Sequence, residues 1–437
     1  MAKIVIIGAG SQFGSRLSLD ILAREELRGT DIALVDINAK RLAQVSDFVQ
    51  QAIDNHQLPS KVVATTDRTE VMRGADVVIT SISVGGYAYS GFPWSAEINI
   101  PLKYGVSQCV ADTVGPGGVF RFLRTAPIQR AICEDIKRLC PDAWLLNYTN
   151  PMCMLTWMHS DTGVTNVGLC HSVQGTTHEI ARHVGVPGDE VDALVAGINH
   201  QAWFLKVERK GQDLYPALRA AAADPAKRAK DAVRFEMMEH LGYFVTESSH
   251  HNSEYAAWFR KDAETMQRLG LEKREVKEGG PEPEWRRPGT PGEAPKLVRS
   301  NEYAADIVAA KLVGKTLRFN GNVMNRGLIP NLPEGSCVEV PCLVDRLGIH
   351  PVAVGPLPPQ LAALNRSNIA VQELAVLAAR SHSREAAYHA VLHDPLTSAV
   401  LPLPKIRAMF DEMWTAEKDL LAWMETPAAR AAAGGGG

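Results

Sequence analysis

The chain has 437 residues, a length that predicts two or three domains at roughly 100–200 residues per domain. Its 46% hydrophobic and 22% charged residues are typical of a globular protein, and its formal net charge of −3 lacks the positive charge with which proteins bind nucleic acid or anionic membranes. The seven cysteines form no CxxC pair, and the N-terminus predicts a strand instead of a signal peptide. We therefore expect a cytoplasmic protein that binds neither nucleic acid nor a membrane.

The first predicted element is a strand over residues 3–7, which is followed by a glycine-rich segment, residues 8–14 (GAGSQFG), and an apolar-periodic helix. Strand, glycine turn and helix in this order are typical of a dinucleotide site, because small residues let backbone amides and the helix N-terminus approach a pyrophosphate. We therefore expect Gly8, Gly10 and Ser11 to bind a dinucleotide cofactor.

The spacing of this motif departs from the usual GxGxxG fingerprint, since its third glycine, Gly14, stands one position late. We expect Phe13 to take the position of close helix packing instead. The second predicted strand, residues 32–35, ends at Asp36, which lies 22 residues past Gly14. An acid at about this distance binds the ribose hydroxyls of adenosine and favours NAD over NADP. Alternatively, Asp36 is a helix cap ahead of Ile37.

Further strand-like runs alternate with helical patterns as far as residue 195. They lie at residues 62–64, 76–80, 109–110, 143–146, 164–169 and 191–198. This alternation predicts a Rossmann-like, doubly wound parallel sheet that forms an NAD-binding domain over residues 1–195. Three polar loops follow its strands, where open parallel sheets bind ligands. These loops are residues 83–87, 111–118 and 147–152.

From residue 196 the alternation weakens, which predicts an α+β domain over residues 196–430. We assign substrate and metal to this domain because of the candidate ligands described below, and the order of the two domains would suit an architecture like that of lactate and malate dehydrogenases. The polar, aromatic residues 246–259 predict a site-lining loop that opens into a helix, and residues 268–299 predict a surface excursion or lid. The other expected elements are strands at 203–207, 315–320 and 337–340, helices within 217–241, 359–380 and 404–424, a helix capped by Ser300, and a disordered Ala/Gly tail at 431–437.

Two candidate metal ligands each follow an apolar, strand-like run. Cys170 follows residues 164–169, and His200 follows residues 191–198. A rigid strand end can present a ligand into a cleft, and a metal with only two protein ligands stays open to substrate, as catalytic metals do. Taken alone, each residue could equally be an ordinary buried cysteine or a hydrogen-bonded core histidine.

These motifs, taken in sequence order, resemble glycoside hydrolase family 4, the NAD- and metal-dependent glycosidases. The resemblance spans most of the chain and rests on residues 7–11 (IGAGS), 112–118 (DTVGPGG), 147–151 (NYTNP), 168–176 (GLCHSVQGT), 197–200 (GINH), 253–255 (SEY) and 331–333 (NLP). It implies a glycoside hydrolase that needs NAD and a divalent cation, usually manganese, and that forms a homodimer or homotetramer.

The residues after the cysteine track the substrate within this family. Residues 170–173 (CHSV) resemble the branch of the bacterial α-galactosidases, whereas branches with Asp or Asn after the cysteine act on 6-phosphorylated sugars. The resemblance therefore implies hydrolysis of α-D-galactosides. An α-galacturonidase or an α-glucosidase of the same family stays open, and the fold alone would also suit a lactate- or malate-type NAD dehydrogenase.

Carried over to this chain, the resemblance makes Cys170 and His200 the metal ligands, with the sugar's 2- and 3-hydroxyl oxygens as the others. It implies that NAD⁺ takes a hydride from C3 of the sugar, after which the metal polarises the ketone and makes the C2 proton removable. Tyr255 is the candidate base for this proton, with Tyr243 and Tyr303 as rivals. His171 is the candidate acid that protonates the leaving oxygen, or else orients the substrate, and water addition with return of the hydride regenerates the cofactor.

Two further residues are expected to bind the substrate. Asn150 is placed to bond sugar hydroxyls, with helix capping as the alternative. Asp112 would fix a side chain of the active site, although a buried carboxylate that closes a loop would look the same in the sequence. His250 and His251 stand close to Tyr255, and the sequence does not distinguish a role in the site from a surface pair.

Overall fold

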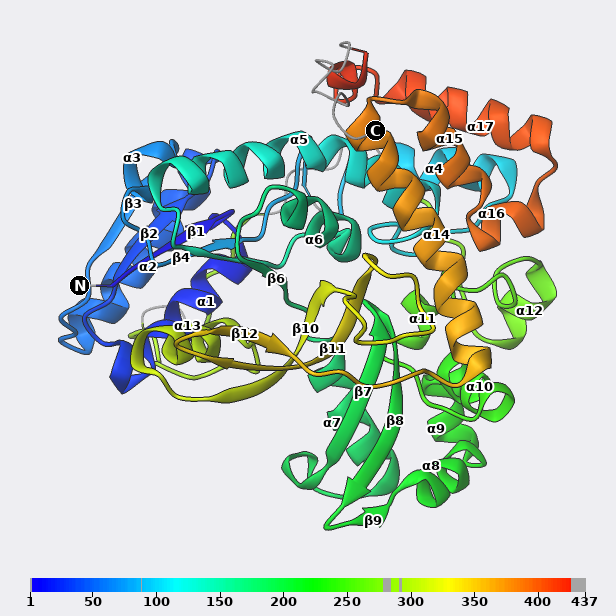
Figure 1. The fold of residues 1–437 in the computed structure, drawn as a ribbon, viewed down its shortest axis with the longest axis horizontal. Helices are drawn as coiled ribbons and strands as arrows, with labels where there is room; N and C mark the ends of the chain where they lie inside the picture. Colours follow the sequence, from blue (N-terminus) through cyan, green and yellow to red (C-terminus); the bar gives the residue numbers. More distant parts are fainter. Residues whose placement is uncertain (1, 88, 278–283, 291–292, 426–437) are drawn as a thin grey trace, which may run out of the picture.

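The computed structural model describes residues 2–87, 89–277, 284–290 and 293–425 (Figure 1). The chain folds around one twelve-stranded sheet in the order β3-β2-β1-β4-β5-β6-β10-β11-β7-β8-β9, with β12 paired to β11. The first six strands in this order are parallel to one another. They are β1 (Lys3–Ile7), β2 (Asp31–Val35), β3 (Val62–Thr65), β4 (Val77–Thr80), β5 (Trp144–Asn147) and β6 (Asn166–Gly168).

These six strands form the predicted Rossmann-like half of the fold. The apolar strands β1 and β4 are buried almost throughout, as is usual for a parallel sheet with helices on both faces. The helices are α1 (Gln12–Leu22), α2 (Ala39–Asn55), α3 (Thr69–Met72), α4 (Trp94–Tyr104), α5 (Gly115–Leu139), α6 (Met152–Asp161) and α7 (Ser172–Val184). One predicted strand is wrong, because residues 109–110 form a loop whose amides bind the Glu254 carboxylate instead of a neighbouring strand.

The second half of the sheet begins where β10 pairs antiparallel with β6. Its strands are β7 (Asp192–Ile198), β8 (Gln201–Arg209), β9 (Gln212–Asp213), β10 (Leu317–Met324), β11 (Cys337–Asp345) and β12 (Gly348–Pro351). Its helices are α8 (Tyr215–Ala222), α9 (Pro225–Lys230), α10 (Ala232–Leu241), α11 (Ser249–Asn252), α12 (Ala263–Arg268), α13 (Ala304–Val313), α14 (Pro359–Ser381), α15 (Arg384–Leu392), α16 (Pro395–Val400) and α17 (Leu403–Ala416). The predicted α/β fold with an α+β second half is confirmed.

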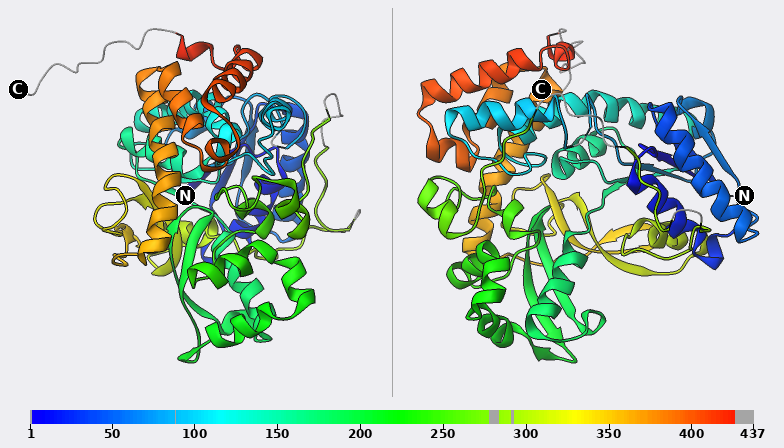
Figure 2. Two further views of the ribbon diagram at one scale, coloured as in Figure 1. Left: turned by 90° about the vertical axis from the view of Figure 1, so that its right-hand side faces the viewer. Right: turned by 180° about the vertical axis from the view of Figure 1, so that it is seen from behind.

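The helices gather in separate groups around this sheet. Helices α14 to α17 pack with α4 and α5 at one end of the molecule, and α8 to α10 lie beside β7 and β8 at the other (Figures 1 and 2). Aromatic rings join the first group, as in the pair Phe120 of α5 and Phe410 of α17, whose centroids are 5.6 Å apart. Between the two groups the sheet itself provides the floor on which the polar loops meet.

The predicted division into domains 1–195 and 196–430 stays a prediction. The position between residues 195 and 196 lies inside β7, which pairs with β8 and β11 of the second half. One core cluster also joins the halves, since it contains Ile4 of β1 together with Ile369 of α14. The tail at residues 431–437 lies outside the described residues.

The glycine-rich turn brings α1 close to β1. A Cβ atom on Gly14 would lie 2.2 Å from the Ala9 carbonyl oxygen, so only glycine permits this contact. Phe13 packs its ring edge-on against Tyr148 at a centroid distance of 4.6 Å. The expectation that Phe13 takes the close-packing position is therefore wrong, and Gly14, one position late, has that role.

One predicted helix start is also wrong. Helix α13 begins at Ala304, because the hydroxyl and amide of Ser300 bind the Asp20 carboxylate in α1 instead of capping a helix. The predicted loop at residues 246–259 contains the single-turn helix α11, and turns then lead to α12, with Arg260 donating to the Ser253 hydroxyl over 2.6 Å.

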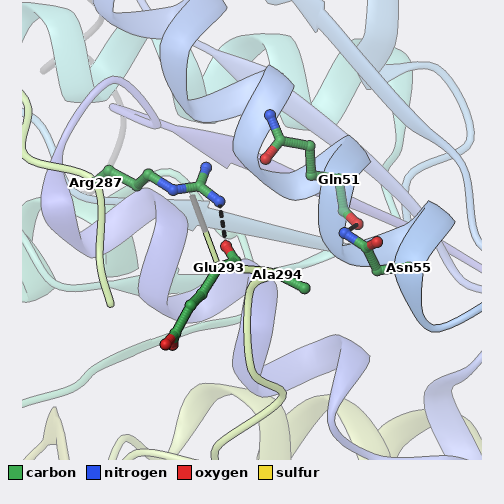
Figure 3. Close-up of a pocket in the computed structure, with 5 residues that line it drawn as sticks. All are labelled: Gln51, Asn55, Arg287, Glu293 and Ala294. Atoms are coloured by element: carbon green, nitrogen blue, oxygen red, sulfur yellow. Dashed lines mark hydrogen bonds between the residues drawn. The ribbon is translucent and has the colours of Figure 1, made fainter. Parts of the chain in front are cut away.

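The segment between α12 and α13 crosses the surface of α1 and α2, and its described residues form neither helix nor strand. Trp285 packs edge-on against Phe48 of α2, and the Arg286 carbonyl accepts a hydrogen bond of 2.7 Å from Gln12 at the start of α1. Figure 3 shows the pocket that this segment makes with α2, where Arg287 donates to the Glu293 carbonyl. The predicted surface excursion is confirmed for the described residues.

All seven cysteines are free and buried, which agrees with the expected lack of disulfides. Within the described ranges, no helix has both the length and the apolar character that a membrane span requires. The core is thus held by packing and hydrogen bonds instead of covalent links.

We predict that Gly14→Ala destabilises the protein by about 1–3 kcal/mol, because the added methyl group would overlap the Ala9 carbonyl. Gly175→Ala is the matched control, since a Cβ atom there meets nothing within 4 Å and the residue lies inside α7. It should stabilise the protein by about 0.5–1 kcal/mol. Denaturant unfolding of the two variants measures both effects, and equal stability of Gly14→Ala and the wild type would contradict the packing role.

Candidate active site

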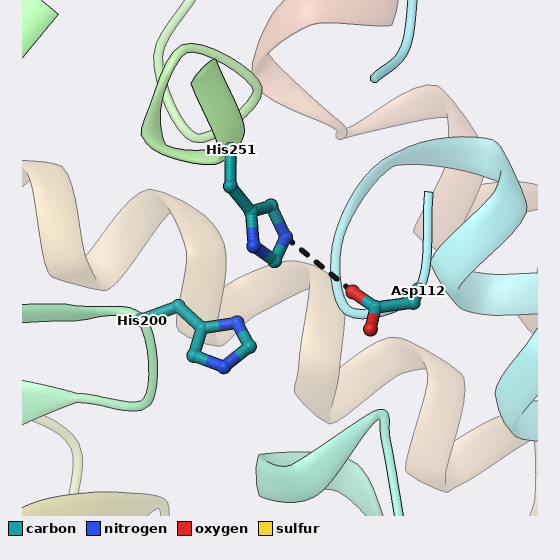
Figure 4. A group of neighbouring side chains, drawn as sticks. All are labelled: Asp112, His200 and His251. Atoms are coloured by element: carbon teal, nitrogen blue, oxygen red, sulfur yellow. Dashed lines mark ion pairs between the residues drawn. The ribbon is translucent and has the colours of Figure 1, made fainter. Parts of the chain in front are cut away.

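Polar side chains from several distant segments meet at the sheet edge where β5 and β6 end. Asp112 comes from the loop before α5, His200 from the hairpin between β7 and β8, and His251 from α11 (Figure 4). Ligand atoms of these three side chains lie within 4.8 Å of one another. A second group, Cys170, His200 and Glu247, meets the same limit and shares the His200 ring.

His200 is held at the tip of a two-residue hairpin turn, where its backbone has a φ of 62°. A non-glycine residue rarely adopts this conformation, which here points the ring into the protein. Its Nδ1 lies 3.2 Å from the Tyr255 hydroxyl, and its Nε2 lies 3.6 Å from a Glu247 oxygen. Burial lowers the pKa of His200 to about 4, so the ring is neutral near pH 7 and one nitrogen has a lone pair for a metal.

Cys170 follows β6 directly, and its side chain is buried beside His200 and Glu247. The Ser172 amide donates to its sulfur over 3.4 Å, which would stabilise a thiolate. Without a cation, burial raises the pKa of this thiol. Sulfur, imidazole nitrogen and carboxylate oxygen together form a donor set that suits a divalent ion, and the two predicted ligands, Cys170 and His200, are among them.

Tyr255 is fully buried, and its hydroxyl contacts His200. The side chain of Asn368 in α14 donates to the Tyr255 carbonyl over 3.0 Å, which helps to fix the Tyr255 backbone. Of the two rivals, Tyr243 packs on Tyr215. Tyr303 packs on Phe319 and lies near Cys170, so it stays a rival. Burial raises the pKa of the Tyr255 phenol well above its usual value, so only a neighbouring positive charge would ionise it.

The carboxylate of Asp112 binds side chains from three directions. It accepts hydrogen bonds from Asn150 over 2.7 Å, from Tyr89 over 2.9 Å and from Thr113 over 2.8 Å. Its other close neighbour is His251, at 3.4 Å. Burial would raise the pKa of Asp112, but the facing His251 ring holds it well below its usual range. The Asp112 carboxylate therefore holds the side chains of Asn150, Tyr89 and Thr113. These contacts go beyond the closing of its own loop.

The Asn150 side chain uses its amide nitrogen and leaves its amide oxygen without a partner. Its amide nitrogen donates to Asp112, while its Oδ1 is buried and has no hydrogen-bond partner among the described residues. The helix-capping alternative is wrong, because the N-cap of α6 is Pro151 and no side chain caps it. An acceptor without a partner is what a sugar hydroxyl would satisfy.

His251 faces three carboxylates, at 3.4 Å from Asp112, 3.7 Å from Glu254 and 3.8 Å from Glu247. Burial lowers its pKa, but Asp112 and Glu247 more than offset this and raise the pKa of His251 well above its usual value. The ring is thus an imidazolium near pH 7. His250 instead faces Arg260 and Arg274, and burial and these charges lower its pKa.

Three residues of this site were missed by the sequence analysis, namely Tyr89, Glu247 and Glu254. The Glu254 carboxylate accepts from three consecutive amides, those of Cys109, Val110 and Ala111. This ties the Tyr255 segment to the Asp112 loop. Both glutamates belong to residues 246–259, whose polar composition did predict a site-lining loop.

His171 lies apart from this network. It is the N-cap of α7, its side chain is 68% exposed, and its Nδ1 is 3.7 Å from Glu302, which in turn lies 3.9 Å from Arg16 of α1. The His171 ring is therefore exposed and lies toward Glu302 and α1. Its predicted role as the acid stays a prediction.

The glycine-rich turn forms a narrow cradle beside Asp36. A Cβ atom on Gly8 would lie 2.0 Å from the Ser81 carbonyl oxygen, and one on Gly10 would lie 2.8 Å from the Asp36 carboxyl carbon. Ser11 caps α1 by accepting from the Gly14 amide. Asp36 accepts from the Gly10 amide over 2.8 Å, and Asn38 caps α2, so the helix-cap alternative for Asp36 is wrong. This cradle at a helix N-terminus fits a dinucleotide pyrophosphate.

Comparison with known proteins agrees with this geometry. Residues 3–186 match the family model described as family 4 glycosyl hydrolase, and residues 195–397 match the C-terminal domain of the same family. An α-galactosidase of Bacillus subtilis (strain 168) is 41% identical over 96% of this chain and 99% of its own length. An α-galactosidase of Rhizobium meliloti (strain 1021) is 37% identical over 95% and 88%.

A similar fold occurs in a 6-phospho-α-glucosidase from gut microorganisms, solved in complex with NAD and Mn²⁺. The TM-score is 0.75 with 20% identity, and the match covers 96% of this chain and 98% of the other. The two family models together cover most of the sequence. The chain therefore belongs to glycoside hydrolase family 4.

Proposed function

We propose that this protein is an α-galactosidase, which hydrolyses α-D-galactosides with NAD and a divalent cation, manganese by preference. The observation that carries the proposal is that Cys170 and Tyr255 both lie beside the buried ring of His200. The two relatives that are 41% and 37% identical, both named α-galactosidases, support the choice of substrate. The runner-up substrates within the family are α-galacturonides and α-glucosides.

The dinucleotide cradle supports NAD as the cofactor. Gly8, Gly10 and Ser11 would hold its pyrophosphate at the N-terminus of α1. Asp36 has room to accept from the ribose hydroxyls, because each of its oxygens has only one amide partner. A carboxylate there would repel a 2′-phosphate, which favours NAD over NADP. The exposed side chain of Ile37 beside it offers an apolar face for the adenine ring.

Cys170 and His200 would hold the divalent cation. When bound, NAD⁺ would accept a hydride from C3 of the sugar and return it, and the cation would polarise the resulting carbonyl. Tyr255 would remove the C2 proton as a phenolate, which the charge of the cation near His200 would stabilise. Asn150 would accept a sugar hydroxyl through its Oδ1, and Asp112 would hold Asn150 in place. His171 would protonate the leaving oxygen as the bond between C1 and that oxygen breaks. Water would then add at C1 and give a proton back to His171, and Tyr255 would return the proton to C2 before the hydride returns to C3.

This sequence of steps returns the cofactor to its starting state, so the net reaction is hydrolysis. A lactate- or malate-type dehydrogenase would instead release NADH. Membership of the glycoside hydrolase family favours hydrolysis, and a metal held by Cys170 and His200 would have no place in the reaction of such a dehydrogenase. The free cysteines support our proposal that the protein works in a reducing cytoplasm. We also propose that it forms a homodimer or homotetramer, which light scattering would measure.

The cofactor requirement is tested with aryl α-galactosides after the protein is stripped with a chelator. We expect hydrolysis only when NAD⁺, Mn²⁺ and a thiol reductant are all restored, without net NADH. Cys170→Ser should lower kcat/KM about 100-fold or more, because it removes a metal ligand. Cys133→Ser, which changes a buried cysteine in α5, is the control. Hydrolysis at the same rate without NAD⁺, Mn²⁺ and the reductant would contradict the proposal.

The role of Tyr255 is tested with Tyr255→Phe. Loss of a general base should lower kcat by about 100-fold to 10,000-fold, while binding of Mn²⁺ and NAD⁺ stays unchanged. In D₂O the wild type should yield product with deuterium at C2, because the base exchanges its proton with solvent before returning it. Tyr243→Phe, which changes a tyrosine packed on Tyr215, should keep both activity and deuterium uptake. Product without deuterium at C2 would refute proton removal there.

The substrate is tested with a matched panel of aryl α-glycosides. We expect the highest kcat/KM for the galactoside, with the glucoside lower because its C4 hydroxyl points the other way. The galacturonide should be poor unless a cation of the site pairs with its carboxylate. A higher kcat/KM for the galacturonide or the glucoside would move the assignment to that substrate within the family.

A further inference from the structure

We propose that Glu247 is a third protein ligand of the divalent cation, alongside Cys170 and His200. This inference rests on the proposed function, since it concerns the same metal site. Donor atoms of the three side chains lie within 4.8 Å of one another. Two atoms bonded to one ion at about 2.0–2.5 Å each lie at most about 4–5 Å apart, so a single ion can reach all three.

The orientation of Glu247 matches this role. Its Oε2 points to His200 Nε2 at 3.6 Å, while His200 Nδ1 faces Tyr255 on the other side of the ring. The ring nitrogen that faces Glu247 is thus the one left for a metal. The Glu247 side chain is 21% exposed, so its carboxylate is partly open to solvent, whereas Cys170 is buried.

The backbone holds Glu247 in the same frame as His200. Val245 forms a β-bridge with Trp203 of β8, and the Thr246 amide donates to the Ala202 carbonyl over 2.8 Å. These bonds fasten the segment to the strand that leaves the His200 hairpin. Glu247 itself has a φ of 71°, a conformation that is costly for a non-glycine residue and turns its side chain toward the ring. Its distance from His200 is therefore set by the fold.

Charge balance also calls for a further anion. A cysteine thiolate and a neutral histidine leave a divalent ion with a net charge of +1 in a largely buried site, which is costly. The Glu247 carboxylate brings the sum to zero. The neighbouring His251 side chain still faces Asp112 at 3.4 Å and Glu254 at 3.7 Å, so it does not depend on Glu247 for a carboxylate partner. A carboxylate oxygen also makes the donor set harder, and so more suitable for manganese than a thiolate and an imidazole alone.

The test measures Mn²⁺ affinity in the absence of sugar for the full chain with NAD⁺. Glu247→Gln keeps the size of the side chain and removes its charge, and it should raise the Kd for Mn²⁺ about 100-fold, close to the effect of Cys170→Ser. Glu239→Gln is the matched control, because this partly exposed residue of α10 pairs with Arg228 and should leave the Kd unchanged. Circular dichroism and unfolding curves show whether each variant is folded.

A second readout separates a ligand from a neighbour that merely orients His200. Manganese is usually six-coordinate, so three protein ligands leave about three bound waters and two leave about four. Water-proton relaxation should therefore report about three waters in the wild type and one more in Glu247→Gln at saturating Mn²⁺. Equal water counts in the two proteins, or equal Kd values, would overturn the inference.

The outcomes also separate this inference from the function on which it rests. If Cys170→Ser loses Mn²⁺ while Glu247→Gln binds it normally, the two-ligand site stands and Glu247 is not a ligand. If the wild type itself does not bind Mn²⁺, or if Cys170→Ser binds it as well as the wild type, both the metal site and the proposed function fail.

Discussion

The ring of His200 is the group on which the arrangement of the site depends. The hairpin between β7 and β8 holds it at a φ of 62°, with Nδ1 3.2 Å from the Tyr255 hydroxyl and Nε2 3.6 Å from Glu247. A metal on Nε2 would leave the ring proton on Nδ1, aimed at the Tyr255 oxygen. On the proposed function, metal binding and ionisation of the base are therefore coupled through one imidazole.

The charged groups around this ring alternate in sign. Asp112 and Glu247 flank the His251 imidazolium, and each carboxylate has a pKa held below its usual range although burial opposes this. Such a buried network is stable only when each charge has a partner. The Glu254 carboxylate, with its three amide donors, fixes the loop that carries Asp112. The network thus places the oxygen atoms of the site before any ligand arrives.

Local apolar runs were sufficient to predict the parallel strands of the sheet. They marked Cys170 and His200 only as candidates, and the role of the two residues as metal ligands was implied by the family resemblance. The structure brings the two side chains together. It failed where contacts join distant segments, as for Glu254 and Cys109, which are 145 residues apart. Residues 246–259 were recognised as site-lining from their composition, but no pattern shows that Glu247 adopts a positive φ and faces inward. The Phe13 error has a similar cause, since the start of α1 decides which residue meets Ala9.

The backbone of the site is strained at several residues, and the atoms that this strain fixes bear on the choice between galactose and glucose. Three of the six non-glycine residues with positive φ among the described residues, Ala111, His200 and Glu247, line this site, at about 1–3 kcal/mol each. The strain fixes the atoms that would hold the cation and, through it, the sugar's 2- and 3-hydroxyls. Galactose and glucose share those hydroxyls and differ at C4, so the cation cannot distinguish them. Epimer choice must then come from side chains that contact the C4 hydroxyl, and not from the cation.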